Sequence, residues 1–162
     1  MRDRAMFQQE ELYNELLRLF SPLLDSLGLR LWGLQVPASR GGTIRVYIDS
    51  PEGISIDRCA EVSRHLSNIL DAEDPVPGSY TLEVSSPGLE RPFFSLEQVL
   101  EYQGHRVNLK TRTPVEGRKK WRGRVLSGER GLLHLDTEQG SQAFSWEDIQ
   151  FVHLIYEGSE SG

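Results

Sequence analysis

Cysteine is almost absent from this 162-residue sequence, and the motifs of common catalytic and nucleotide-binding sites are missing altogether. Cys59 is the only cysteine, which excludes an intramolecular disulfide and a CxxC metal site. The chain contains no GxxxxGK(S/T), GxGxxG or HExxH motif, and its four histidines lack ligand spacing. No apolar run is long enough to span a bilayer, and no signal-like apolar segment is visible. We therefore expect a cytoplasmic protein without cofactor, metal, membrane partner or small-molecule substrate.

Acidic residues are in excess, but the basic residues are concentrated in one place. The formal net charge is −6, from 18 Lys and Arg against 24 Asp and Glu. The segment from Gly104 to Leu126 contains eight of these basic residues and a single acidic one, Glu116. A basic patch on an acidic body predicts local binding of a polyanion with little indiscriminate attraction elsewhere.

The stretch from Leu82 to Pro92 divides the sequence. Tyr80, Leu82 and Val84 alternate with polar residues, as in a strand with one apolar face. The strand must stop at Pro87, which has no N–H for a ladder, and Gly88 can adopt the positive φ of a tight turn. We therefore predict two domains, residues 1–92 and residues 93–162.

Apolar spacing in the first domain alternates between helical and strand periods. Leucines at three- and four-residue intervals predict a helix over residues 7–27, kinked at Pro22 and ended by Gly28. Two strands follow, with Trp32, Leu34 and Val36 expected on one face of the first. A helix over residues 57–70, capped by Ser55 or Asp57, precedes the strand that leads into Pro87. The order predicts an αββαβ two-layer sandwich with both helices on one face of the sheet.

The second domain is predicted to be a small all-β barrel of the Sm or SH3 type. Ser95 and Gln98 fit a capping box for a short helix over residues 95–102. Glycines then separate five short apolar-alternating segments, which suggests a closed or nearly closed sheet. These strands are expected at residues 106–111, 120–126, 132–136, 142–145 and 151–156. The tail, residues 157–162, is expected to be disordered.

Alternation places the basic side chains on one side of this barrel. Val107 and Leu109 should point inward with Trp121, leaving the basic positions of the same strands outside. Long basic side chains are suited to phosphate contacts that do not read bases. The tryptophans at 121 and 146 are expected in the core rather than stacked on bases. The candidate phosphate-binding residues are Arg106, Lys110, Arg112, Arg118, Lys119, Lys120, Arg122 and Arg124, of which Arg112, Arg118, Lys119 and Lys120 are expected in a loop.

Two alternatives to polyanion binding remain open. The basic barrel could belong to a protein–protein adaptor that binds an acidic partner without RNA. Ser85 or Ser86 could be the nucleophile of a small hydrolase, although the GxSxG elbow is absent and spacing nominates no His or Asp partner. The two hydroxyls are better explained by hydrogen bonds to backbone groups where the strand ends. We expect no catalytic residue.

The centre of the sequence resembles the signature of the bacterial ribosome maturation factors of the RimP family. The matching run is Glu83-Val84-Ser85-Ser86-Pro87-Gly88-Leu89-Glu90-Arg91-Pro92. The resemblance implies a cytoplasmic, monomeric assembly factor that binds the immature small ribosomal subunit, through its rRNA and a small-subunit protein, without catalysis. In that context Arg91 could contact rRNA, or it could pair with Glu83 or Glu90 to fix the connector.

Overall fold

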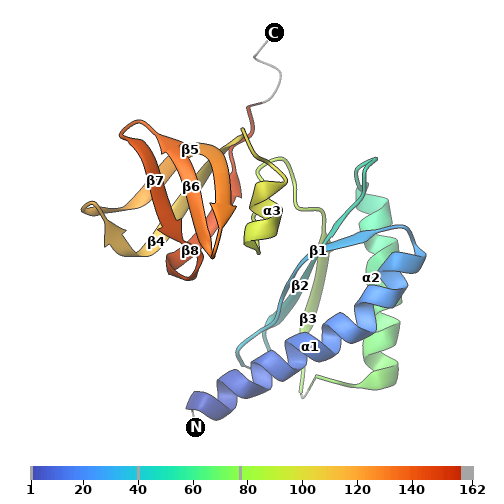
Figure 1. Cartoon of the computed structure of the whole chain (residues 1–162). Coiled ribbons are helices and arrows are strands. Elements are labelled where there is room, and N and C mark those ends of the chain that lie inside the picture. Colours follow the sequence, from blue (N-terminus) through green and yellow to red (C-terminus); the bar gives the residue numbers. More distant parts are fainter. Residues whose placement is uncertain (1, 40, 77, 158–162) are drawn as a thin grey trace. The chain divides into compact units, whose positions relative to one another are not determined.

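The computed structural model describes residues 2–39, 41–76 and 78–157, and the chain forms two compact units, Met1–Pro87 and Gly88–Gly162. Residues 158–162 of the predicted disordered tail lie outside the described residues. The fold is mixed α+β, with an αβ unit followed by a β-rich unit (Figure 1). This agrees with the predicted fold class, while the Sm or SH3 type of the second unit stays a prediction.

The N-terminal unit has the predicted order of helices and strands. Its strands form a sheet in the order β1-β2-β3, in which β1 and β2 are antiparallel and β2 and β3 are parallel. A parallel neighbour requires a crossover, and α2 supplies it between β2 and β3. The elements are α1 (Arg2–Ser26), β1 (Arg30–Gln35), β2 (Thr43–Asp49), α2 (Ile56–Glu73) and β3 (Thr81–Ser85).

One hydrophobic core holds both helices against one face of this sheet. The centre of that face is the alternating set Ile44, Val46 and Ile48 of β2, each fully buried. Against it pack Leu16, Phe20 and Leu24 of α1, and Val62, Leu66 and Leu70 of α2. The predicted arrangement, with both helices on one face, is therefore confirmed (Figure 1).

The ends of the helices follow from their capping residues. Gly28 has φ +73°, and the Leu29 N–H donates to the Leu24 carbonyl, which closes α1 in a Schellman motif. The Ser55 hydroxyl accepts from the Arg58 N–H and begins α2. Helix α1 continues through Pro22 as one element.

The predicted facing of β1 is wrong at Trp32. The pairing register with β2 shifts between Leu31 and Gly33, so an irregularity at Trp32 interrupts the alternation. Leu31 and Leu34 both pack on the core, whereas Trp32 is outside that cluster and its ring lies beneath the Arg30 guanidinium, 5.1 Å from the centroid. A bulge inserts one residue into one strand, and strict alternation in the sequence cannot reveal it.

The C-terminal unit contains the five predicted strands in one sheet. Their order is β7-β6-β5-β4-β8, all neighbours being antiparallel, and the sheet is curled (Figure 1). Its buried interior includes Val107, Leu109, Trp121, Leu135 and Phe144. The elements are α3 (Leu96–Leu100), β4 (Arg106–Val115), β5 (Arg118–Glu129), β6 (Leu132–Thr137), β7 (Gly140–Ser145), the 3-10 turn η1 (Trp146–Asp148) and β8 (Ile149–Leu154).

The short helix α3 is capped at the predicted residue. The Ser95 hydroxyl accepts from the Gln98 N–H at 3.2 Å, as expected for the N-cap. The Gln98 side chain accepts instead from the Phe94 N–H at 2.7 Å, one residue before the position a capping box would use. A Cβ built on Gly128 would lie 3.0 Å from Leu100 and 3.1 Å from Leu96, so α3 packs closely on β5 where no side chain intervenes.

The end of the signature run belongs to the C-terminal unit. Strand β8 is at the edge of the sheet, and the chain just after Gly88 runs along it. The Leu154 N–H donates to the Arg91 carbonyl at 2.9 Å, the Phe93 N–H donates to the Val152 carbonyl at 2.9 Å, and a bridge joins Pro92 to His153. The division into units falls after Pro87, a few residues before the boundary predicted after Pro92, because this pairing attaches residues 91–93 to the second sheet.

Candidate nucleic-acid interface

The basic segment folds into a long β-hairpin rather than the strand–loop–strand unit predicted. Strands β4 and β5 continue to Val115 and Arg118, which pair with each other. Glu116 and Gly117 between them have φ +50° and +83°, the two positive values that a type I′ two-residue turn requires. Arg112, Arg118, Lys119 and Lys120 therefore lie on strands, and their predicted position in a loop is wrong.

Five cations share the outer face of this hairpin, opposite the buried Val107, Leu109 and Trp121. The register places Arg106 directly opposite Arg124 and Lys110 directly opposite Lys120. Arg122 is opposite Asn108, whose side-chain oxygen accepts from the Arg122 Nε at 3.0 Å. Like charges directly across a strand pair destabilise it, so this face places cations where folding alone would not favour them.

The Lys110–Lys120 pair lies nearer the hairpin turn than the Arg106–Arg124 pair. Within the described part of the chain, no carboxylate lies at ion-pair distance from Lys110 or Lys120. Arg124 is more restrained, because its Nη1 donates to the Gly104 carbonyl at 2.7 Å and its Nη2 lies 3.9 Å from Glu157. Asp136 is its register partner on β6. The positive face therefore ends toward β6 and is strongest around Lys110 and Lys120.

Two of the predicted phosphate-binding arginines are used within the fold. The Arg118 guanidinium lies 4.0 Å from the centroid of Trp121, whose indole N–H donates to the Arg118 carbonyl at 3.1 Å. The Arg112 Nε donates to the Glu147 carbonyl at 3.4 Å. Lys119 is exposed near the hairpin turn. The structure thus brings together Arg106, Lys110, Lys120, Arg122 and Arg124, and leaves the other three outside this face.

Aromatic side chains extend the same face onto β8. Phe151 is opposite Lys110 and His153 is opposite Asn108, so both side chains share the outer side with the cations. Phe151 is 45% exposed. Trp121 is buried as predicted, whereas Trp146, also expected in the core, is only half-buried in η1. Phe151 was not among the candidate residues, although its alternation with the buried Val152 and Leu154 was a usable signal.

The signature residues have structural contacts of their own. Gly88 has φ +81°, which confirms the predicted positive φ. Glu83 forms an ion pair with Arg45 at 3.2 Å across β2 and β3. The Arg91 guanidinium lies 5.4 Å from the centroid of Tyr102 in the same unit, a cation–π contact that favours a structural role. The rest of the predicted connector set is Ser85, which ends β3, followed by Ser86, Pro87, Leu89, Glu90 and Pro92.

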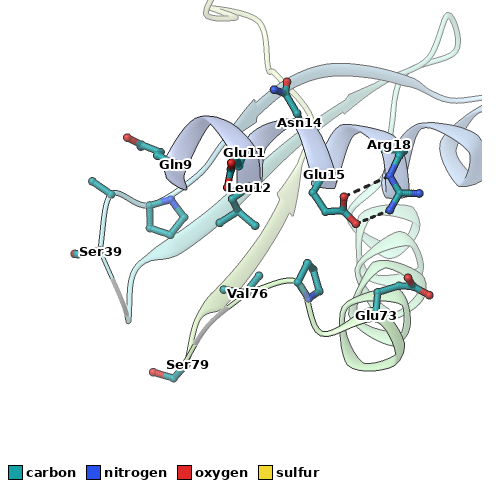
Figure 2. Close-up of a pocket in the computed structure, with 13 residues that line it drawn as sticks. Gln9, Glu11, Leu12, Asn14, Glu15, Arg18, Ser39, Glu73, Val76 and Ser79 are labelled. Atoms are coloured by element: carbon teal, nitrogen blue, oxygen red, sulfur yellow. Dashed lines mark hydrogen bonds and ion pairs between the residues drawn. The ribbon is translucent and has the colours of Figure 1, made fainter. Parts of the chain in front are cut away.

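The N-terminal unit has a surface hollow of different character. Figure 2 shows it between α1, the segment after β1 and the segment after α2. Glu11, Glu15 and Glu73 line it together with Arg18, and Arg18 is paired with Glu15. An excess of carboxylates repels phosphate, so the hollow does not suit a nucleic-acid backbone.

No group of three or more His, Cys, Asp or Glu among the described residues is arranged to hold a metal ion. In the same residues, no helix combines the length and apolar character needed to cross a bilayer.

Residues 19–90 match the family model described as the RimP N-terminal domain. The match begins within α1, covers the whole three-stranded sheet and ends inside the signature run. It rests on the N-terminal unit, whereas the basic face described above lies in the C-terminal unit.

Proposed function

Because this chain belongs to the RimP family of ribosome maturation factors, we propose that it binds the immature small ribosomal subunit in the cytoplasm and assists its maturation. The family is non-catalytic, and we extend that property to this chain. In this proposal the protein acts as a monomeric assembly factor that binds rRNA and a small-subunit protein, and then leaves the finished ribosome.

One observation supports rRNA as the ligand: the paired cations on the outer face of β4 and β5. Two like-charged pairs, Arg106–Arg124 and Lys110–Lys120, lie directly across from each other with Arg122 between them. An RNA backbone offers phosphates at regular spacing that would relieve this repulsion. The contacts would be electrostatic and largely independent of sequence, so the RNA fold and the protein partner would supply selectivity.

A hydrolase is less well supported by the geometry. Ser85 is the last residue of β3, and the backbone of Ser86 hydrogen-bonds to the Cys59 thiol. Within the described residues, neither serine hydroxyl hydrogen-bonds to a histidine. A Ser nucleophile needs a base within hydrogen-bond reach. Alanine at both positions should therefore leave maturation activity intact.

Co-sedimentation on sucrose gradients tests the assembly-factor proposal. The wild-type chain should migrate with immature small subunits and bind large subunits and finished ribosomes more weakly. Equal binding to all three particles would overturn the proposal. If binding survives ribonuclease treatment of the particles, the adaptor alternative, with an acidic protein as ligand, replaces rRNA.

A matched pair of variants localises the interaction. Lys110→Gln with Lys120→Gln removes two charges from the basic face, and Arg64→Gln with Arg130→Gln removes two exposed charges from α2 and from the β5–β6 turn. We expect the first pair to weaken co-sedimentation and to flatten its salt dependence, whereas the second should behave as wild type. Equal effects would indicate a response to net charge alone.

A further inference from the structure

Phe151 exposes a large apolar ring where the strand alternation would allow a polar residue. Its neighbours Val152 and Leu154 are 1% and 9% exposed and fill the interior, so the outward ring is not needed for the core. Exposed aromatic rings next to cations recur where proteins bind single-stranded nucleic acid, because every base presents a π-face for stacking. The exposed ring is therefore a candidate contact surface.

The surroundings of Phe151 provide complementary groups in one row across three strands. Phe151 on β8 is opposite Lys110 on β4, and Lys110 is opposite Lys120 on β5. Neighbouring strands are about 4.8 Å apart, so the row spans roughly 10 Å, the scale of one nucleotide with its phosphates. A flat apolar ring at one end and two ammonium groups beyond it match a base and its backbone.

A second row beside the first keeps the ring in place. His153, two residues further along β8, stacks on Phe151 with centroids 5.9 Å apart and an interplanar angle of 22°. His153 is opposite Asn108, which is held by Arg122. The bridge from Pro92 to His153 secures the outer edge of β8. The ring is therefore carried by a paired strand rather than by a loop, which suits a preformed stacking surface.

We propose that Phe151 stacks on an unpaired base of RNA while Lys110 and Lys120 bind the adjacent phosphates. This inference rests on the proposed function of the basic face and specifies its ligand as single-stranded RNA, such as a loop or an unfolded segment of immature rRNA. Bases in a duplex are stacked on one another and present no free face to a side chain on the surface of a sheet. We therefore expect Phe151, Lys110 and Lys120 to bind unpaired RNA more tightly than duplex RNA.

The test compares the full chain and its variants on two probes, a fluorescein-labelled oligoadenylate and an RNA duplex of equal length. Phe151→Ala should weaken binding to the single strand by about 5- to 140-fold, the range for loss of one stacked base. Its duplex affinity and its salt dependence should match wild type, because no charge is removed. Phe151→Trp should restore single-strand binding, whereas Phe151→Leu, which fills space without a π-face, should not.

Controls separate this inference from the proposed function. Leu132→Ala removes a similarly exposed apolar side chain, 37% exposed on β6, and should leave both affinities unchanged.

If Phe151→Ala binds the single strand normally while Lys110→Gln with Lys120→Gln does not, the face binds phosphate without stacking and only this inference is overturned. If neither change affects either probe, the rRNA role of the face is overturned as well. If Phe151→Ala also binds ribonuclease-treated subunits more weakly than wild type does, Phe151 contacts a protein. That result would overturn the inference as well. Melting curves confirm folding, and the Leu and Trp variants decide the question if the Ala variant unfolds.

Discussion

The Arg118 guanidinium lies 4.0 Å from the centroid of the Trp121 ring, and the Trp121 indole N–H donates back to the Arg118 carbonyl. Two residues predicted to lie in a phosphate-binding loop and in the core therefore form one local contact. Arg118 covers the Trp121 ring at the end of the buried interior of this unit, and its positive charge interacts with the face of that ring.

Arg118→Gln should lower the free energy of unfolding by about 0.5–1 kcal/mol, because the cation–π contact is lost. Lys119→Gln, the adjacent and exposed control, should be neutral within about 0.5 kcal/mol. Urea denaturation of both variants measures the difference. If Arg118→Gln left stability unchanged and lowered the magnitude of the log–log salt slope for RNA binding by about 0.7–0.9, Arg118 would instead be a phosphate-binding residue.

Lys110→Gln with Lys120→Gln should change stability and binding in opposite directions. Removing like charges that face each other should raise the free energy of unfolding by about 0.2–1 kcal/mol. The magnitude of the log–log salt slope for RNA binding should fall by about 1.4–1.8, since each lost phosphate contact contributes roughly 0.7–0.9. Titrations at several salt concentrations and a melting curve test both. A stability loss would show that the lysines have stabilising partners instead.

Gly88→Val should be costly because Gly88 has φ +81°. An L-residue in the left-handed region costs about 1–2 kcal/mol, and a β-branched one is especially strained there. The space around a Cβ at Gly88 is open, so the loss would report backbone strain rather than a clash. Leu89→Val in the same segment, 65% exposed, is the control. A melting temperature equal to wild type would mean that this turn adopts another conformation.

Arg91→Ala should reduce stability rather than binding. The contact with Tyr102, whose ring also packs edge-on against Phe93 at 5.4 Å, should contribute about 0.5–1 kcal/mol. Glu90→Ala, at the exposed neighbouring position, should have little effect. Thermal melting and co-sedimentation below the melting temperature are measured together. Lost sedimentation with intact stability would assign Arg91 to the ligand.

Cys59 should react slowly with alkylating reagents at neutral pH. Burial raises the pKa of the Cys59 thiol, and its hydrogen bond with the Ser86 backbone offsets this only in part. The thiolate is the reactive form, so a raised pKa leaves less of it at any pH below that pKa. Iodoacetamide labelling should therefore reach half its maximal rate at a higher pH than free cysteine does. The same chain in guanidinium is the control, and equal pH profiles would contradict the expectation.

The strands and helices were largely predictable because their apolar periods are regular. Ile44, Val46 and Ile48 alternate on β2 and are all buried, as their spacing indicates. The errors lie where one residue changes the register. The sequence predicts a longer loop in place of the type I′ turn at Glu116 and Gly117, since Asn-Gly and Asp-Gly are the stronger signals for that turn. A bulge such as that at Trp32 has no signature in the alternation itself.

The candidate site was predictable in charge but not in arrangement. The density of Lys and Arg between residues 104 and 126 located the basic face, yet sequence could not show which cations face each other. That information depends on the register of β4 with β5, which the turn sets. Phe151 became part of the face only through the pairing of β8 with β4, a contact between segments distant in the chain.

The pairing of residues 91–93 along β8 limits the length of the segment that connects the two units. Strand β3 ends at Ser85 and the next backbone group that hydrogen-bonds to a strand is the Arg91 carbonyl, which leaves the segment 86–90 as the connector. Fully extended, such a segment reaches only about 17 Å. If each unit binds its own surface on the ribosomal particle, the second contact forms at an effective concentration in the millimolar range. Two weak contacts would then hold the particle with high avidity, and rearrangement of either surface would be enough to release the protein.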